Sequence, residues 1–274
     1  PEYYPTRRET AILTRHAADI ASTTDATMMV ELGSGTSTKT RLLLDAFAAN
    51  AAEHGRTFTY VPVDVSSEML RSTADVLATD YPSLVIEPVL ADFTEPGLRL
   101  PETDGSRLAA FLGGTIGNFD DAARHAFFAR LSEALSPGDY LLLGADRVKD
   151  TGRLVAAYDD KAGVTADFNR NMIEVLRRGL DATGLFVDDF DHIARWNPKK
   201  HRIEMWLRAR RDVDAHFGAL DRDWSLPAGA EILTEISTKF APDQLADELS
   251  AAELPVVTTW TDDADDFQVT LSRR

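Results

Sequence analysis

Glycines follow an apolar run near the start of the chain, in the segment ELGSGTSTKT at residues 31–40. A strand that ends in glycines and continues as a helix offers free backbone amides to an anionic or nucleotide-like ligand. Three kinds of ligand suit such a turn. They are a dinucleotide, the phosphates bound by a P-loop, and S-adenosylmethionine (SAM).

Thr38 separates these possibilities. The P-loop pattern Gly-x4-Gly-Lys-[Ser/Thr] and the dinucleotide pattern Gly-x-Gly-x-x-Gly, both counted from Gly33, require a glycine at position 38. A side chain there would obstruct the close backbone approach that those motifs need. SAM has no pyrophosphate and needs only a tight turn with exposed amides. Glu31 ahead of Gly33-Ser34-Gly35-Thr36-Ser37 therefore favours SAM.

Carboxylates follow the next two apolar runs. Asp64 lies at the end of the run 58–65, where it can accept hydrogen bonds from both ribose hydroxyls or, alternatively, cap the helix that follows at Ser66. Asp92 follows the run 84–90, where it can accept from the adenine amino group while Phe93 covers the ring. Open α/β sheets bind ligands at the carboxyl ends of their strands, so these features together predict a SAM site.

An α/β fold must bring these strand ends together. Apolar runs at 27–32, 58–65, 84–90, 108–115 and 140–144 alternate with helical patterns at 40–49, 68–79 and 121–135, after a first helix at 7–22. This alternation predicts a parallel sheet with helices on both faces. A helix at 242–251 and strands at 256–261 and 267–271 end the chain. The result is the seven-stranded layout of a class I, Rossmann-like methyltransferase.

The pattern changes after Asp150. Residues 151–182 are expected to be helical, and strands are expected at 186–194 and 201–209, joined by a turn at Asn197-Pro198. In the second of these strands apolar and polar residues alternate, which is typical of a half-buried strand.

Composition narrows the partners. The 274 residues carry a net charge of −16, which argues against nucleic acid, because phosphate binding depends on clustered Lys and Arg. The absence of cysteine excludes disulfides and thiolate metal sites, and we expect no metal. No apolar stretch approaches the roughly 18 residues of a membrane span, and no signal peptide is visible. We expect a cytoplasmic protein with no membrane partner and a small-molecule substrate. The sequence begins at Pro1, and we expect that an N-terminal segment precedes it.

Longer motifs carry a resemblance to a known family. The segments are PEYYPTR at 1–7, GSGTSTKTRLLLDA at 33–46, FLGGTIGNF at 111–119, DRVKDTGRLVAAYDDKAGVTADFNRN at 146–171, RIEMWLRAR at 202–210 and LTEISTKF at 233–240. Together they closely resemble the histidine Nα-methyltransferases of ergothioneine biosynthesis. The resemblance implies that three methyl groups pass from SAM to the α-amino group of L-histidine, giving hercynine, and that the protein is a monomer.

The resemblance also implies a division of the chain. We expect a SAM-binding core at residues 1–149 with an N-terminal segment that contacts the substrate, an inserted α+β substrate-binding domain at 150–240, and a return to the core at 241–274. The family carries a further segment ahead of PEYYPTR, with another tyrosine near the substrate. That segment lies outside this sequence, so its role is not assigned.

Site residues follow from the resemblance, position by position. Those matched to the cofactor site are Gly33, Lys39, Asp64, Asp92, Phe93 and Gly113, with Lys39 as the partner of the methionine carboxylate. Those matched to the substrate are Tyr3 and Tyr158 at the carboxylate, Asn118 at the α-amino group, and Glu235 and Ser237 at the imidazole. Asn118 and Tyr158 are the candidate catalytic residues.

The substrate assignments have plainer alternatives from the residues alone. Asn118 could be a turn residue after Gly117, the tyrosines could be packed rings with a wet hydroxyl, and Glu235 and Ser237 could line the exposed face of a strand. Two other functions stay open as well. One is methylation of another amino acid or of a histidine derivative, and the other is a SAM-binding module without catalysis.

Overall fold

The computed structural model describes residues 2–35, 39–95, 97 and 99–274, and the chain divides into two compact units. The sheet unit comprises Pro5–Arg147 and Phe240–Arg274. The inserted unit comprises Val148–Lys239 together with the start of the chain up to Tyr4. The three-part division expected from the sequence stays a prediction.

One large sheet organises the sheet unit. Its order is β3-β2-β1-β5-β6-β14-β13, and β4 also pairs with β2. The strands are β1 (Met28–Leu32), β2 (Phe58–Asp64), β3 (Leu84–Ile86), β4 (Val89–Leu90), β5 (Arg107–Phe111), β6 (Tyr140–Asp146), β13 (Val256–Thr261) and β14 (Phe267–Arg273). All pairs are parallel except those of β14, which runs antiparallel to both β6 and β13. The predicted class I methyltransferase layout is thereby confirmed.

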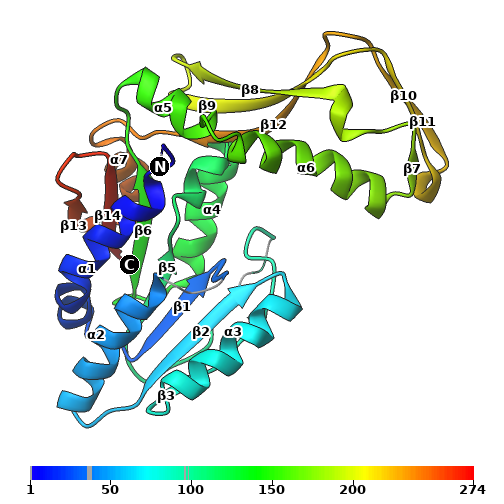
Figure 1. Ribbon diagram of the computed structural model, residues 1–274. Helices are drawn as coiled ribbons and strands as arrows, with labels where there is room; N and C mark the ends of the chain where they lie inside the picture. The colour runs from blue at the N-terminus through cyan, green and yellow to red at the C-terminus, as the bar shows by residue number, and fades with distance from the viewer. Residues whose placement is uncertain (1, 36–38, 96, 98) are drawn as a thin grey trace. The chain divides into compact units, whose positions relative to one another are not determined.

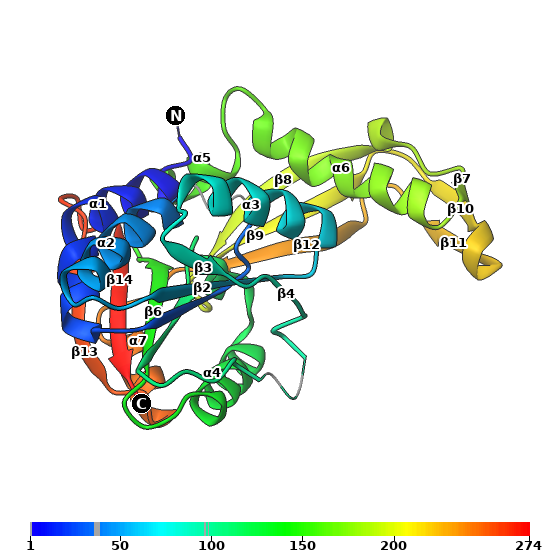
Figure 2. The same cartoon turned by 90° about the horizontal axis from the view of Figure 1, so that it is seen from below.

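Helices cover both faces of this sheet (Figure 2). On one face lie α1 (Pro5–Thr24), α2 (Thr40–Glu53) and α3 (Ser67–Asp80), whose apolar residues share a core with Met29 and Leu108. On the other face lie α4 (Asp121–Ala134) and α7 (Gln244–Ala251), which pack with Val30 and Ala109. Successive residues of β1 thus face opposite cores, as the two-residue period of a strand requires.

The third predicted strand was wrong in one respect. The sequence indicated one strand at 84–90, whereas the structure has β3 and β4 separated by Glu87 and Pro88. Proline has no N–H to donate to a neighbouring strand, so pairing with β2 is interrupted there. The register still runs forward, from Tyr60 opposite Ile86 to Val63 opposite Val89.

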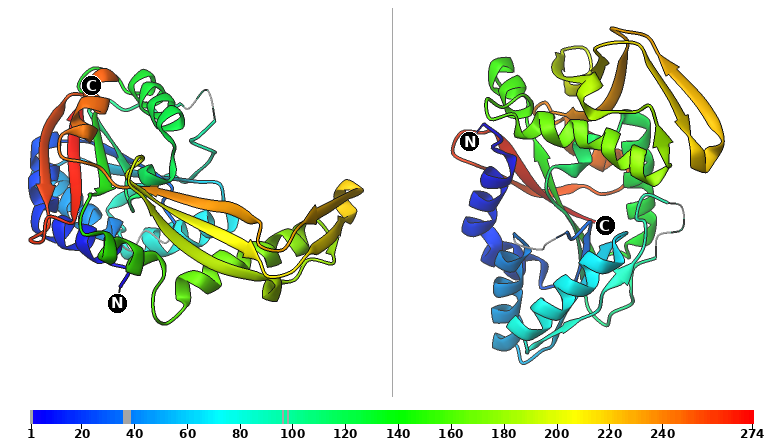
Figure 3. Two further views of the ribbon diagram at one scale, coloured as in Figure 1. Left: turned by 90° about the horizontal axis from the view of Figure 1, so that it is seen from above. Right: turned by 45° about the vertical axis from the view of Figure 1, so that its right-hand side comes forward.

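The inserted unit is built on two small antiparallel sheets (Figures 1 and 3). The first has the order β12-β9-β8, from β8 (Phe190–Asn197), β9 (Arg202–Ala209) and β12 (Glu231–Thr238). The second has the order β11-β10-β7, from β7 (Ala182–Thr183), β10 (Val213–Phe217) and β11 (Arg222–Leu226). Its helices are α5 (Thr151–Tyr158) and α6 (Val164–Gly179), with the 3₁₀ turns η2 (Val187–Asp189) and η3 (Gly218–Leu220). The α6 helix runs along β8 and β9.

The sequence predicted one helical stretch at 151–182, and here too the structure differs. The chain leaves the helix after Tyr158 and starts α6 from Gly163, which has a φ of +75°. The Asp160 carboxylate accepts hydrogen bonds from the backbone N–H groups of Val164 and Thr165 at 3.1 and 2.8 Å. These bonds, with that of Thr165 the strongest, lower the pKa of Asp160 to about 2. Asp160 thus satisfies amides that begin the second helix.

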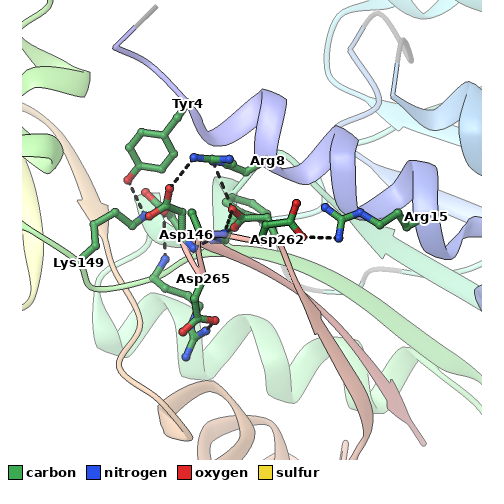
Figure 4. A network of polar contacts seen from close by, with 12 residues as sticks. Tyr4, Arg8, Arg15, Asp146, Lys149, Asp262 and Asp265 are labelled. Carbon is green, nitrogen blue, oxygen red and sulfur yellow. Dashed lines mark hydrogen bonds and ion pairs between the residues drawn. The ribbon is translucent and has the colours of Figure 1, made fainter.

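Ion pairs fasten α1 to the turn between β13 and β14 within the sheet unit (Figure 4). Arg8 lies 3.3 Å from Asp262 and 3.1 Å from Asp266, whose side chains are almost fully buried, and Arg15 lies 2.7 Å from Asp263. The acidic turn is therefore partly neutralised by the first helix.

The two points at which the chain leaves and re-enters the sheet unit are adjacent. Arg147 and Phe240 form a parallel β-bridge, and the Phe240 N–H donates to the Asp146 carbonyl at 2.9 Å.

Among the helices of the described residues, none combines the length and the apolar character needed to cross a bilayer.

Candidate cofactor and substrate sites

The glycine turn after β1 lies at the carboxyl edge of the parallel strands. Gly33 has a φ of +72°, and its N–H donates to the Val63 carbonyl at 2.8 Å. A Cβ at Gly33 would lie 3.5 Å from the Phe93 ring, so the turn and that ring are already in contact distance. Thr36, Ser37 and Thr38, on which the choice of cofactor depended, lie outside the described residues.

A buried carboxylate holds two of the predicted cofactor residues together. Glu9 on α1 is fully buried and accepts from the Gly113 N–H at 2.8 and 3.0 Å. The Lys39 ammonium contacts the same carboxylate. Gly144 on β6 makes room for it, because a Cβ there would come within 2.0 Å of Glu9 Oε1. Sequence reasoning missed Glu9, since nothing in PEYYPTRRE marks that glutamate as buried.

Glu31, the acidic residue ahead of the glycines, is buried inside the sheet unit. Its carboxylate accepts from Thr40 Oγ1 at 2.7 and 2.9 Å and from the Tyr60 hydroxyl. Burial raises the pKa of Glu31 to about 7, against the opposing effect of these hydrogen bonds. Glu31 therefore links the start of α2 to β2 and stabilises the elements on both sides of the glycine turn.

Asp64 accepts hydrogen bonds from the backbone of both the glycine turn and the residue that caps α3, and its contact with the ribose stays a prediction. One carboxylate oxygen accepts from the Gly35 N–H at 3.2 Å, and the other accepts from the Ser66 N–H at 3.0 Å. A carboxylate has about four lone-pair sites. Asp64 can therefore order both the glycine turn and the start of α3 and retain capacity to accept from two ligand hydroxyls.

Asp92 and Phe93 follow β4 at the same edge. The Asp92 carboxylate accepts from the Thr94 hydroxyl at 2.6 Å and the Thr94 N–H at 2.8 Å, which lowers its pKa. It lines a small cavity of about 120 Å³ whose other walls include Val30 and Val63. Phe93 packs edge-on against Phe111, with 5.4 Å between ring centroids.

The loop after β5 carries Gly113 and Asn118. Gly113 and Gly114 have φ values of +86° and +71°, a conformation that side chains disfavour, and they lead into the 3₁₀ turn η1 (Thr115–Asn118). Ile116 is fully buried beneath this turn, whereas the Asn118 side chain is exposed. The buried isoleucine anchors the turn and leaves the Asn118 amide available to a ligand.

The inserted unit contains a compact polar cluster of three residues. The Tyr158 hydroxyl lies 2.8 Å from Ser237 Oγ. The Lys239 ammonium donates to both oxygens, at 2.9 Å to Tyr158 and 2.8 Å to Ser237. Tyr158 and Ser237 are buried, and Lys239 has no exposed surface. The structure therefore brings two predicted substrate residues together.

Sequence reasoning missed Lys239 entirely, although it lies inside the quoted motif LTEISTKF. Lys239 places a buried ammonium directly against the Tyr158 hydroxyl and ring.

Tyr3 belongs to the same neighbourhood. Its ring meets the Tyr158 ring edge-on, with 5.8 Å between centroids, and it is 43% exposed. The next residue, Tyr4, is buried, and its hydroxyl accepts from the Lys149 ammonium at 2.7 Å (Figure 4). Tyr4 therefore anchors the start of the chain, while the Tyr3 side chain stays partly exposed.

Glu235 lies on β12 two residues before Ser237, so the two side chains share a face of the strand. Glu235 is opposite Met205 of β9, and Met205 is buried in the small core of this unit. Burial raises the pKa of Glu235, and the Lys239 charge acts in the opposite direction. The result is a half-buried carboxylate beside a buried hydroxyl, which can accept a ring N–H.

Tyr158 is also held through its backbone. His192 Nε2 lies 2.8 Å from the backbone carbonyl of Tyr158, which is the last residue of α5. Asn169 Nδ2 lies 2.9 Å from His192 Nδ1 and donates to the Trp206 carbonyl at 3.2 Å. With Nδ1 accepting from this amide, His192 can donate from Nε2 to the Tyr158 carbonyl. Neither residue was singled out from the sequence.

The predicted residues thus fall into two groups, one in each unit. In the sheet unit are Gly33, Lys39, Asp64, Asp92, Phe93, Gly113 and Asn118, and in the inserted unit are Tyr3, Tyr158, Glu235 and Ser237. Within the described residues, no cluster of three or more histidine, aspartate or glutamate side chains has the arrangement of a metal site.

Comparison with known proteins gives matches over the whole chain. Residues 1–274 match a family described as "Histidine-specific methyltransferase, SAM-dependent". The chain is 49% identical to a histidine N-alpha-methyltransferase of Mycolicibacterium smegmatis and 47% identical to one of Mycobacterium tuberculosis, in each case over 100% of this chain and 84% of the relative. It is 30% identical to the ergothioneine biosynthesis protein 1 of Neurospora crassa, over 95% of this chain and 29% of that protein.

Proposed function

The chain belongs to the family of SAM-dependent, histidine-specific methyltransferases, and from this premise we propose that it trimethylates the α-amino group of L-histidine to hercynine. The reaction is a step of ergothioneine biosynthesis. The observation that carries the proposal is the 49% identity to a histidine N-alpha-methyltransferase along all 274 residues.

The carboxyl edge of the sheet suits SAM. Lys39 offers an ammonium for the methionine carboxylate, Asp64 keeps lone pairs for two ribose hydroxyls, and Asp92 beside Phe93 suits the adenine. The positive φ of Gly33 leaves the turn open to a ligand. SAM supplies an electrophilic methyl group on its sulfonium.

Asn118 suits the α-amino group because its amide oxygen accepts an N–H without charge. The attacking amine must be neutral, and a carboxylate in the same place would stabilise the ammonium form. The first two transfers each leave an ammonium that must lose a proton before the next. The neutral dimethylated amine that enters the third transfer already lacks an N–H for Asn118, and the third transfer leaves a quaternary nitrogen that Asn118 cannot hold by a hydrogen bond.

The inserted unit suits the rest of the amino acid. Tyr3 and Tyr158 can donate to the carboxylate, and Glu235 with Ser237 can bind the imidazole. The half-buried Glu235 favours a ring that carries an N–H over a purely apolar side chain, because its carboxylate would otherwise be desolvated without a partner.

Mass spectrometry of L-histidine incubated with SAM and the protein tests the proposal. We expect products with one, two and finally three added methyl groups. Tryptophan and a pre-methylated histidine are compared in parallel. A protein inactive on histidine but active on another amino acid would contradict the substrate. A protein that binds SAM and releases no S-adenosylhomocysteine with any amino acid would contradict the enzymatic function.

We further propose that the protein is cytoplasmic and a monomer, and that neither nucleic acid nor a membrane is its partner. The net charge of −16 supports the exclusion of nucleic acid.

A further inference from the structure

Lys239 is a buried cation in contact with two hydroxyls, Tyr158 Oη and Ser237 Oγ. An ammonium only donates, so at both Tyr158 Oη and Ser237 Oγ it occupies a lone pair. The 2.8 Å contact between these two oxygens consumes one of the two hydroxyl protons. One hydroxyl proton of the pair remains to be donated elsewhere.

The lysine also strengthens that remaining donor. A hydroxyl that accepts from a charged group is polarised and becomes a better donor, most of all where water is excluded. All three side chains are buried, so the polarisation acts at low dielectric. The pair therefore presents one strong O–H donor backed by positive charge, and the group that matches such a donor is an anion.

We propose that Lys239 is a specificity-determining residue that makes the protein select substrates with a free α-carboxylate. It acts through Tyr158, whose proton is directed to the carboxylate when Ser237 donates to Tyr158. Lys239 is thus a positioning residue that never touches the substrate. The inference rests on the proposed function, since it assigns a carboxylate recognition step to a histidine methyltransferase.

The assignment also gives Ser237 a defined role. If its proton is used on Tyr158, then Ser237 faces the substrate only as an acceptor. Glu235, on the same face of β12, is likewise an acceptor when ionised. The face therefore accepts from the imidazole ring, while the Tyr158 hydroxyl donates to the carboxylate.

Histidine and histidinamide separate this proposal from a merely structural role. The two substrates share the ring and the α-amine, but histidinamide has no carboxylate. We expect wild-type protein to prefer histidine in kcat/KM, and Lys239→Met to reduce that preference by on the order of tenfold or more, the range of a hydrogen bond to a charged group. The comparison is made between proteins at one pH, so the different basicity of the two amines cancels.

Two further variants complete the design. Lys239→Gln keeps a donor without the charge and serves as a second test if the methionine variant unfolds; we expect an intermediate preference. Lys200→Met removes an exposed lysine of the same unit and is expected to leave the preference unchanged. Thermal unfolding and SAM affinity of each variant show whether the fold is retained.

The outcomes are distinct. Wild-type protein that does not methylate histidine contradicts the proposed function itself. Wild-type protein that methylates histidine and histidinamide equally well overturns the role of Lys239, as does a folded Lys239 variant that lowers both activities by the same factor. A selective loss on histidine alone supports it.

Discussion

At the scale of single residues, the ionisation of Glu235 has the most direct consequence for binding. Its pKa is raised by burial, so it becomes protonated at a higher pH than an ordinary glutamate. A protonated carboxyl no longer accepts well from an imidazole N–H. Histidine affinity is therefore expected to be present above this raised pKa and to be lost as the pH falls through it.

Calorimetry of Glu235→Ala and Glu235→Gln tests this role. We expect the alanine variant to lose about 1.5–3 kcal/mol of histidine binding, the value of a hydrogen bond to a charged group, and to bind SAM as before. The glutamine variant cannot titrate at this position, so the part of the pH dependence that it lacks belongs to Glu235. Equal losses for histidine and SAM in the alanine variant would exclude a specific contact with the ring.

In the protein without histidine, the raised pKa of Glu235 makes the folding stability depend on pH in the opposite direction. Burial favours the neutral carboxyl, so Glu235 stabilises the folded state at low pH relative to the unfolded chain. That contribution is lost as the pH rises through the raised pKa. Histidine binding and folding stability thus depend on the pH in opposite directions at this residue.

Single residues also show what a sequence can and cannot reveal. Gly33, Asp64, Asp92 and Phe93 were predicted because each follows a strand that the apolar pattern marks. Glu9 and Lys239 were missed because charged residues are rarely buried, and nothing beside them in the chain signals it. Their partners, Gly113 and Tyr158, lie far away in sequence. Such contacts exist only once the fold is formed.

At the scale of elements, the close approach of α1 to β6 depends on Gly144. A Cβ there would meet Glu9 Oε1 at 2.0 Å, so Gly144→Ala must displace the carboxylate or the helix. We expect the variant to lose about 1–3 kcal/mol of folding stability, the usual cost of overpacking. We also expect weaker SAM binding, because Glu9 orients both Lys39 and the Gly113 amide.

Denaturant unfolding and SAM calorimetry measure these two effects. Gly179→Ala is the matched control, since a Cβ at Gly179 meets nothing within 4 Å and the residue ends α6. That substitution is expected to be neutral or to stabilise by up to about 1 kcal/mol. A Gly144→Ala protein with unchanged stability and SAM affinity would show that the Glu9 carboxylate is free to move.

Helices and strands were predicted well where the apolar periodicity was strong. They were predicted poorly where a single residue interrupts a strand or separates two helices. The helices and parallel strands of the sheet unit follow from apolar spacing. Pro88 divides a strand and Gly163 directly precedes a helix. Both residues are local features of the sequence, so these two breaks could have been predicted. The β10–β11 hairpin was missed, although Val213–Phe217 and Arg222–Leu226 alternate in burial as short strands do.

At the scale of the whole molecule, the proposed monomeric state can be tested by measuring the mass of the protein in solution. Sedimentation equilibrium at micromolar concentration is expected to give a mass near 30.2 kDa. The surface most able to cause dimer formation is a row of apolar side chains on α6, where Val164, Phe168 and Val175 are 60–68% exposed. Contiguous apolar surface favours association. A mass of twice this value that returns to that of a monomer on Phe168→Ser would contradict the proposal and identify the interface.

The bridge between Arg147 and Phe240 has a consequence for how such a chain can change over evolution. Because residues 148–239 leave and rejoin the sheet unit at neighbouring backbone positions, recombination at two points could exchange that stretch without displacing the strands of the sheet. The start of the chain up to Tyr4, which belongs to the same unit, would then have to fit the new block. On the proposed division of the site, such an exchange would alter the contacts to the ring and carboxylate of the amino acid and leave the proposed SAM site unchanged.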